Sequence, residues 1–308
     1  MWNLWGDREV LRSVRQGRKG TGVFFLGGGI SGVKGGAFAA ALEQTRSIVI
    51  EQTLIAGESA GAAAATALVA QSARECVRIF PEYCSQPGFV ELSRHKLPIR
   101  LRADRVVAIM AGRDHEHHRA FNLEALERSL HRLRIGITSI ESGQQHLIAP
   151  GSVEEALRAL RISMSVPLRN QEHEWWSINS VPTLVTDGAF AQARDFNSLL
   201  EEGVDHLLVV ASDGIGVLGN ALVSVESSQH RLVMWLLLRH LPPAIVKGRM
   251  NKYKTLVEQL HATRKKIRVL VVAPEKRFLH AFKQDRGQIE FALARAFHGA
   301  CALLRGAT

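Results

Sequence analysis

Two consecutive strand-turn-helix patterns near the start of the chain constrain its fold most strongly. GVFFL at 22–26 predicts a short apolar strand that runs into the glycines of GGGISG, and the small residues from Val33 onward predict a helix. IVIEQTLIAG at 48–57 predicts the next strand, and the alanine-rich stretch after Ser59 predicts a helix suited to close packing against a sheet. This βαβα order predicts parallel strands joined by a right-handed crossover.

Later apolar runs extend the same pattern along the chain. They predict strands at 105–110, 183–185, 206–212 and 267–274, with helices at LEALERSLHRL and VEEALRALR between them. No internal repeat or linker interrupts the pattern. The simplest organisation is therefore an N-terminal basic arm or amphipathic helix over 1–20 and a single α/β domain over 21–308, with a core over about 21–215 and a basic portion over about 216–308.

The composition is that of an ordinary globular protein. The chain has 308 residues, of which 46% are hydrophobic and 22% charged, enough for a sizeable core. Charges interrupt the apolar residues of the first 20 positions, so no signal peptide is predicted. The longest apolar run, LVMWLLL at 232–238, is far shorter than the roughly 20 residues that span a bilayer. The spacing of Cys76, Cys84 and Cys301 fits neither a disulfide framework nor a zinc site, so we expect a cytoplasmic protein. We also expect that it can associate peripherally with membranes.

The positive charge is concentrated in the last part of the chain. The net charge is +10, and the chain from Arg231 onward contains 16 Lys and Arg residues but four acidic residues. Such a segment can attract an anionic membrane surface, whereas a nucleic-acid partner is not expected because Tyr253 is nearly the only aromatic residue among these charges. Alternatively, KGRMNKYK and ATRKKIR are solvated helix faces.

The glycine loop after the first predicted strand fits two kinds of anion site. Gly27, Gly29 and Gly32 match the dinucleotide-binding fingerprint, and Glu51 lies about 20 residues on, where a ribose-binding acid is expected. The same bare backbone also suits an oxyanion hole, which stabilises a reacting carbonyl group.

The pentapeptide GESAG at 57–61 favours the oxyanion hole. It has the form of a nucleophile elbow, in which small residues on both sides of Ser59 allow a sharp turn that exposes the serine hydroxyl above the sheet. The helix that follows directs its N-terminal N–H groups at the same place. Because both turns follow neighbouring parallel strands, Gly28 and Gly29 can present N–H donors to an intermediate on Ser59, each donor being worth roughly 3 kcal/mol.

Three motifs, in order, make the chain resemble the patatin-like phospholipases. That family has a glycine-rich oxyanion loop of the type GGGxRG, a G-x-S-x-G elbow one helix later, and a downstream Asp-Gly-Gly or Asp-Gly-Ala. This chain has GGGISG at 27–32, GESAG at 57–61 and Asp187-Gly188-Ala189. RALRISMSVPL, MNKYKTLVEQL and FALARAFHGACALL also resemble family segments, so that the likeness covers nearly the whole chain.

The resemblance implies a three-layer α/β sandwich with a mostly parallel central sheet and helices on both faces. It implies an acyl hydrolase for phospholipids or related lipid esters that uses Ser59 as nucleophile and Asp187 as base, with no histidine, no cofactor and no metal ion. The implied oxyanion hole consists of Gly27, Gly28, Gly29 and the Ala60 N–H, and the remaining motif glycines are Gly32, Gly57, Gly61 and Gly188.

The oxyanion loop departs from the family at one position. Ser31 stands where the family usually has a basic residue, and the nearest cation is Lys34, just inside the following helix. Either that charge is dispensable, or Lys34 replaces it, or the hydrolase is weak.

Other interpretations remain open at this stage. An ordinary α/β-hydrolase triad would pair Ser59 with Asp213 and His230, although that fold has several strands before its elbow. A binding module without catalysis would use the loop for a dinucleotide or act as an inactive lipid-binding relative. The cluster His115, Glu116, His117 and His118 matches no familiar metal site, so we interpret it as a solvated turn.

Overall fold

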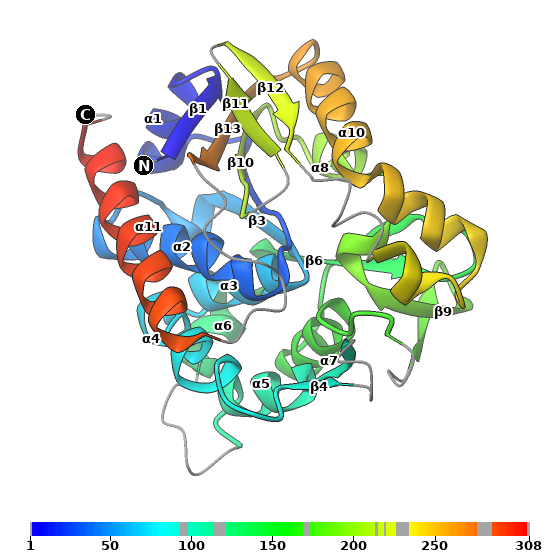
Figure 1. Cartoon of the computed structure of the whole chain (residues 1–308). Helices are drawn as coiled ribbons and strands as arrows, with labels where there is room; N and C mark the ends of the chain where they lie inside the picture. Colours follow the sequence, from blue (N-terminus) through cyan, green and yellow to red (C-terminus); the bar gives the residue numbers. More distant parts are fainter. Residues whose placement is uncertain are drawn as a thin grey trace.

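A mixed β-sheet occupies the centre of the molecule (Figure 1). The computed structural model describes residues 2–92, 98–113, 121–168, 173–212, 215–218, 220–225, 234–275 and 285–306. Within these residues the sheet has nine strands in the order β1-β13-β10-β2-β3-β6-β9-β8, with β7 paired to β6. The strands are β1 (Trp2–Gly6), β2 (Thr21–Phe25), β3 (Thr53–Glu58), β6 (Leu133–Ser139), β7 (Gln145–Ile148), β8 (Glu174–Ile178), β9 (Val181–Asp187), β10 (His206–Val210) and β13 (Arg268–Pro274).

The five central strands run parallel. β10 pairs in parallel with β13 and with β2, β2 with β3, and β3 with β6, whereas β1, β7 and β9 are antiparallel to the strands they join. The expected α/β class with a large, mostly parallel sheet is thus confirmed. Parallel strands are covered on both faces, which explains why β2 and β10 are buried throughout.

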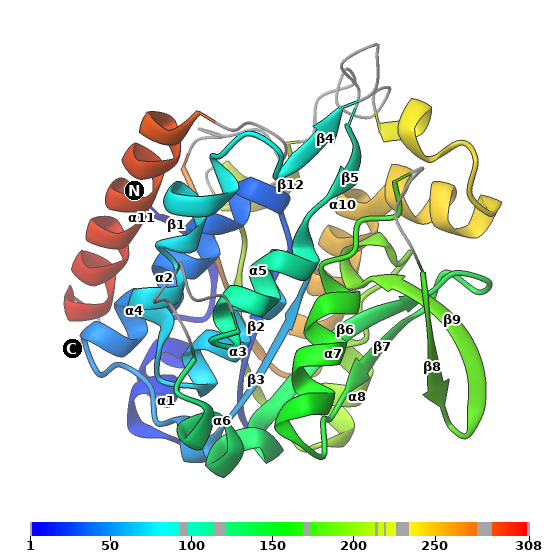
Figure 2. The ribbon, with the colours of Figure 1, turned by 90° about the horizontal axis from the view of Figure 1, so that it is seen from below.

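Helices cover both faces of the sheet (Figure 2). Side chains alternate along β2, so that Val23 and Phe25 join the core under one group of helices. Phe24 points to the opposite face, where its ring meets that of Phe196 edge to face beneath the other group. The first group is α1 (Glu9–Gln16), α2 (Val33–Gln44), α3 (Ala60–Val69), α7 (Val153–Ser163) and α11 (Arg286–Gly306). The second group is α8 (Phe196–Glu201) and α10 (Pro243–Arg264).

Smaller elements complete the described chain. The helical ones are η1 (Gly29–Gly32), η2 (Ile50–Gln52), α4 (Ala73–Cys76), η3 (Phe80–Cys84), α5 (Ala103–Met110), α6 (Leu123–Ser129), η4 (Leu130–Arg132) and η5 (Gly188–Phe190). Two separate hairpins are β4 (Val90–Leu92) with β5 (Pro98–Leu101), and β11 (Ile215–Leu218) with β12 (Ala221–Ser224).

Most predicted elements are present, and two are corrected. The strands at 22–26, 183–185, 206–212 and 267–274 correspond to β2, β9, β10 and β13. The strand predicted at 105–110 is wrong, because these residues belong to α5, where Val106, Val107 and Met110 are buried at helical spacing. The strand predicted at 48–57 starts only at Thr53, after the turn η2.

The ends of the chain also differ from the prediction. The helix expected within 1–20 is confirmed as α1, but Trp2–Gly6 form β1, which pairs antiparallel with β13. Because β13 lies beside β10, the basic portion over about 216–308 contributes a strand to the central sheet. In the described parts of the chain, no helix is both long and apolar enough to cross a membrane.

Candidate active site

The three sequence motifs meet at the carboxyl ends of the central strands. β2 leads into the glycine loop, and the neighbouring parallel strand β3 leads into the elbow at Ser59. β9 approaches from the opposite direction and ends at Asp187, which pairs with Ile137 of β6. Three segments that are far apart in the sequence are therefore brought to one edge of the sheet.

Ser59 and Asp187 form a hydrogen-bonded pair. The Ser59 hydroxyl donates to Asp187 Oδ2 at 2.7 Å, and both residues are buried. Ser59 has φ 54° and ψ −131°, a backbone conformation that costs a non-glycine residue about 1–3 kcal/mol. The tight turn also explains two motif glycines: a Cβ on Gly57 would lie 2.3 Å from the Gly61 carbonyl oxygen, and one on Gly61 would lie 2.2 Å from the Phe25 carbonyl oxygen.

Ser163 supports the elbow through two hydrogen bonds. The Ser59 N–H donates to Ser163 Oγ at 2.9 Å, and the Ser163 hydroxyl donates to the Gly136 carbonyl oxygen at 2.6 Å. This hydroxyl joins α7 and β6 to the strained turn. The sequence analysis missed Ser163, which lies two residues beyond the helix predicted at 153–161.

Asp187 is suited to accept a proton near neutral pH. Burial raises its pKa to about 7, against the opposing effects of the Ala189 N–H, the Ser59 hydroxyl and the charge of Lys252. The Ala189 N–H donates to Asp187 Oδ1 at 2.8 Å and so fixes the carboxylate. Gly188 is required here because a Cβ would lie 2.0 Å from the Gly136 carbonyl oxygen.

The glycine loop lies against the elbow residues Ser59 and Ala60. A Cβ on Gly27 would lie 2.7 Å from Ser59 Cβ, and one on Gly32 would lie 2.3 Å from Ala60 Cβ. The Gly27 N–H donates to Glu58 Oε1 at 3.4 Å, so the prediction of Gly27 as an oxyanion donor is corrected to a structural role.

Three predicted oxyanion donors remain candidates. Gly29 has a positive φ of 56° and lines the same pocket as Ser59 and Ala60. The Ala60 N–H starts α3 and belongs to the helical N–H groups without an intrahelical acceptor. Gly28 precedes Gly29 on the same loop, where a side chain would collide with the Ser31 hydroxyl 2.8 Å away.

Ser31 and Lys34 each make a hydrogen bond to a backbone carbonyl at or beside the glycine loop. The Ser31 hydroxyl donates to the Gly28 carbonyl oxygen at 2.5 Å and closes the loop on itself. Lys34 is buried, and its ammonium donates to the carbonyl oxygen of Ser212, just past β10, at 3.1 Å. The cation therefore ties α2 to the end of β10, beside the glycine loop.

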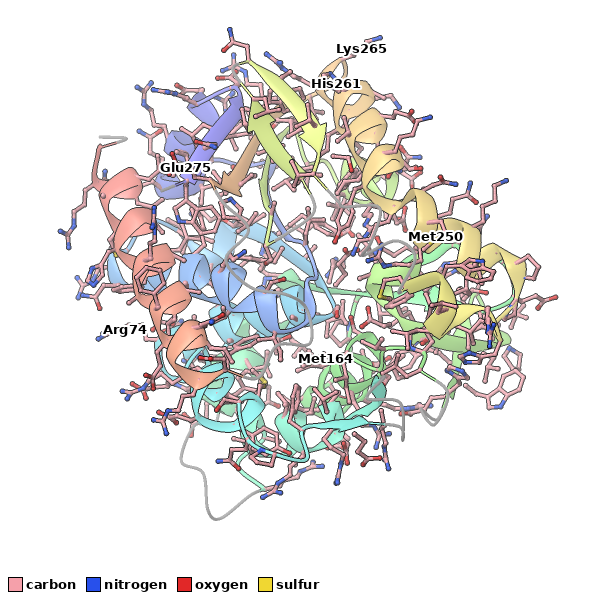
Figure 3. The ribbon with its side chains drawn as sticks, viewed as in Figure 1. Arg74, Met164, Met250, His261, Lys265 and Glu275 are labelled. Carbon is pink, nitrogen blue, oxygen red and sulfur yellow. The ribbon has the colours of Figure 1, made fainter. Side chains whose placement is uncertain are left out.

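An apolar pocket opens beside Ser59. Its volume is about 40 Å³, and besides the site residues it is lined by Ile79, Phe80, Phe89, Val106, Met110 and Met164. Figure 3 shows Met164, which follows α7, facing the interior between the elements on either side of the pocket. The wall of the cavity beside Ser59 is therefore apolar.

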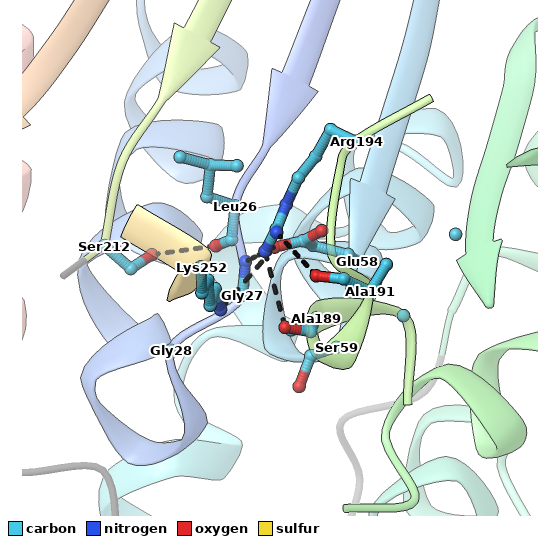
Figure 4. A network of polar contacts seen from close by, with 12 residues as sticks. Leu26, Gly27, Gly28, Glu58, Ser59, Ala189, Ala191, Arg194, Ser212 and Lys252 are labelled. Atoms are coloured by element: carbon cyan, nitrogen blue, oxygen red, sulfur yellow. Dashed lines mark hydrogen bonds and ion pairs between the residues drawn. The ribbon is translucent and has the colours of Figure 1, made fainter. Parts of the chain in front are cut away.

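A buried ionic network lies on the other side of the elbow (Figure 4). Arg194 Nη2 and Glu58 Oε1 are 2.7 Å apart with both side chains fully buried, and Lys252 Nζ lies 3.8 Å from the same oxygen. Gln145 Nε2 donates to Glu58 Oε2 at 2.7 Å and to the Gly188 carbonyl oxygen at 2.8 Å. The network thus connects the elbow with the turn that carries Asp187.

The charges of this network shift each other's ionisation. Burial alone would raise the pKa of Glu58, but the charges of Arg194 and Lys252 outweigh it and hold that pKa below its usual range. Burial and, to a smaller extent, the charge of Arg194 lower the pKa of Lys252 to about 7, against the attraction of Glu58. The sequence analysis missed this network, although Glu58, a charge inside an elbow that must be buried, was a signal that a cation would be needed.

Several alternative site residues are not brought to this place. Glu51 is exposed in η2, before β3 begins, so it lies at the end of the strand opposite to the glycine loop and cannot serve as the ribose-binding acid. Asp213, His230 and the cluster at 115–118 lie outside the described residues. Among the residues that are described, no group of three or more His, Cys, Asp or Glu side chains could hold a metal ion.

Comparison with known proteins adds no assignment. The chain matches no model of a known protein family. A search among curated proteins finds no match either.

Proposed function

We propose that the protein is a serine acyl hydrolase with a patatin-like Ser-Asp dyad, acting on fatty-acyl esters of phospholipids or related lipids. The observation that carries this proposal is the 2.7 Å hydrogen bond between the Ser59 hydroxyl and the buried Asp187 carboxylate at a strained elbow. The adjoining glycine loop and apolar pocket support it, because they provide candidate oxyanion donors and an apolar wall beside Ser59.

The proposed reaction moves one proton through Asp187. Ser59 Oγ attacks the ester carbonyl carbon while its proton passes to Asp187 Oδ2, and the resulting oxyanion accepts hydrogen bonds from Gly28, Gly29 and Ala60. Collapse of this intermediate breaks the ester bond, and the alcohol leaves with the proton from Asp187. Water then attacks the acyl-enzyme and gives a proton to Asp187, which returns it to Ser59 as the carboxylic acid leaves.

The first test is hydrolysis of a fluorogenic acyl ester together with labelling by a fluorophosphonate. We expect Ser59→Ala to abolish labelling, and Asp187→Asn to lower kcat/KM by about 10²-fold or more, as for loss of a general base. In the wild type, kcat/KM should fall as the pH drops below about 7, because Asp187 becomes protonated. Unchanged turnover in both variants contradicts the dyad.

Matched controls separate the dyad from other serine chemistry. Ser177→Ala, on the exposed face of β8, should retain labelling and turnover. Loss of turnover in His230→Ala, with full turnover in Asp187→Asn, would instead support an α/β-hydrolase triad. Stoichiometric binding of NAD in a calorimetric titration would support a dinucleotide-binding module.

We also propose that part of the basic C-terminal portion contacts anionic lipid. Only its exposed charges can do so, because Arg249 and Lys252, which belong to the supposedly solvated KGRMNKYK segment, are buried. The protein should bind anionic vesicles more tightly than neutral ones at low salt. Equal binding to both kinds of vesicle would contradict this partner.

A further inference from the structure

Two strands end against each other at the candidate active site. β3 runs parallel to β6 and ends at Glu58, which pairs with Gly136. β9 arrives from the opposite direction and ends at Asp187, which pairs with Ile137. Because β7 pairs with residues 135–138 from one edge of β6, β3 and β9 must share the other edge. The two strand ends thus meet head to head at consecutive positions of β6.

This junction separates the two members of the dyad. Neighbouring strands are held together by a ladder of backbone hydrogen bonds, whereas β3 and β9 are not neighbours in the sheet and share no ladder. Ser59 follows the end of β3, and Asp187 is the end of β9. Their separation therefore depends on β6, which pairs with both strands, and on side chains that cross the junction.

The Gln145 side chain crosses this junction. Gln145 lies on β7 opposite Thr138 of β6 and is 5% exposed. Its Nε2 donates to Glu58 Oε2 at 2.7 Å and to the Gly188 carbonyl oxygen at 2.8 Å. The Asp195 N–H donates to Gln145 Oε1 at 3.0 Å, which fixes the orientation of the amide. One amide nitrogen therefore joins the end of β3 to the turn after β9.

Gly136 leaves room for this side chain. Since β7 and the two strand ends lie on opposite edges of β6, the Gln145 amide has to pass over β6. A Cβ on Gly136 would lie 3.2 Å from Gln145 Nε2 and 3.4 Å from Gln145 Cδ. A glycine inside a strand often marks such a close approach. The missing side chain at this position of β6 is thus explained by the amide that lies against it.

We propose that Gln145 is a positioning residue that holds the turn after β9 against the elbow, and so keeps Asp187 within reach of the Ser59 proton. In this role Gln145 exchanges no proton and contacts no substrate, and its effect on turnover passes through Asp187. The role rests on the proposed hydrolase function, but the hold of Gln145 on the turn can be measured without turnover.

Gln145→Glu weakens this link while keeping the shape of the side chain. A protonated carboxyl group has one hydrogen where the amide nitrogen has two, so it can donate to Glu58 or to the Gly188 carbonyl oxygen, but not to both. An ionised carboxylate can donate to neither and would face Glu58 as a like charge. In both forms the elbow and the turn after β9 lose the group that joins them.

The kinetic test is a double-mutant cycle with Asp187→Asn, using the fluorogenic ester. We expect Gln145→Glu to lower kcat by about tenfold or more, with KM unchanged because Gln145 does not line the pocket beside Ser59. In the Asp187→Asn background the same substitution should lower kcat less than about twofold, since its effect passes through Asp187. A folded Gln145→Glu protein that loses no activity, or the same factor in both backgrounds, overturns the proposal.

Gln144→Glu is the matched control. Gln144 is the preceding residue of the same type, but its side chain is exposed. This variant introduces the same new carboxyl group one position away from the junction. It should leave both kcat and KM unchanged.

Hydrogen exchange monitored by NMR gives a readout that needs no turnover. The Ala189 N–H donates to Asp187 Oδ1 at 2.8 Å, so its exchange reports opening of the turn after β9. In Gln145→Glu we expect this amide to exchange about tenfold faster or more, while the Val23 amide in β2 keeps its rate. A general loss of stability would accelerate both amides alike and would contradict a specific hold on the turn.

A second variant decides if Gln145→Glu does not fold. Gly136→Ala places a methyl group against the Gln145 amide and leaves every polar group present. It should lower kcat in the wild-type background but not in Asp187→Asn, and an equal loss in both overturns the proposal. If Gln145→Glu accelerates Ala189 exchange but the wild type hydrolyses no ester, the proposed function is contradicted and the hold of Gln145 on the turn remains.

Discussion

The two sides of Ser59 are chemically opposite. Towards η3 and α5 the neighbours are apolar side chains such as Phe80 and Val106, which line the pocket. Towards β7 and α10 they are the buried ions Glu58, Arg194 and Lys252. A pocket can be reshaped by exchanging one apolar side chain for another, whereas a buried ion depends on its counterion. We therefore expect substitutions on the ionic side to cost folding stability and those on the apolar side to change substrate choice.

The largest effect is expected on the ionic side. Arg194→Met leaves Glu58 buried without its closest counterion, and this should lower the free energy of unfolding by about 3–5 kcal/mol. Urea unfolding monitored by circular dichroism measures the loss. Arg12→Met, which removes an exposed pair with Glu9, should cost less than about 1 kcal/mol. Equal losses in both variants would contradict the expectation that the buried ion pair contributes more to folding stability than the exposed one.

An intermediate effect on folding stability is expected at Ser163, the polar residue of α7 that accepts a hydrogen bond from the Ser59 N–H. Ser163→Ala leaves the buried Ser59 N–H without its acceptor, so the free energy of unfolding should fall by about 1–3 kcal/mol. Ser165→Ala is a suitable control, because that hydroxyl donates to the Arg161 carbonyl oxygen in the same helix region and does not support the elbow. A Ser163→Ala protein as stable as the wild type would mean that the elbow does not depend on this support.

The smallest effect is expected at the pocket, as a change in substrate preference. Val106→Trp should fill the space beside Ser59 and lower kcat/KM for a long-chain ester by about tenfold relative to an acetyl ester. Val107→Trp, on the same helix but facing an outer groove, should leave this ratio unchanged. Kinetics with a series of p-nitrophenyl esters measures the ratio. If chain-length preference does not change in Val106→Trp, the pocket does not hold the acyl chain.

The same contrast explains what could be predicted from the sequence. The glycine loop, the elbow and Asp187 were found because sharp turns impose local residue types, and the structure brings Ser59 and Asp187 together. Apolar runs located β2, β10 and β13, but 105–110 was misassigned because a short apolar run fits a strand or a buried helix equally well.

The ionic side could not be found in this way. Lys252 lies in a run of charges that is typical of a solvated helix face, and nothing near it in the sequence indicates burial. Its burial depends on Glu58 and Arg194, which belong to other elements. Long-range charge matching leaves no local pattern, so it becomes visible only when the tertiary structure brings the residues together.

The order in which the ribosome makes these charges has a consequence for folding. Glu58 is synthesised 136 residues before Arg194, and Lys252 emerges later still, on α10. Until Arg194 and Lys252 have been synthesised, the Glu58 carboxylate in the elbow lacks these counterions and is stable only in water. The turn around Ser59 therefore cannot close into its buried position. The nascent chain should therefore hold its first two motifs in an open form, and we expect Ser59 to react with a fluorophosphonate only after β13 has joined the sheet and α10 has packed against it. Fluorophosphonate labelling of stalled ribosome complexes would reveal that late step.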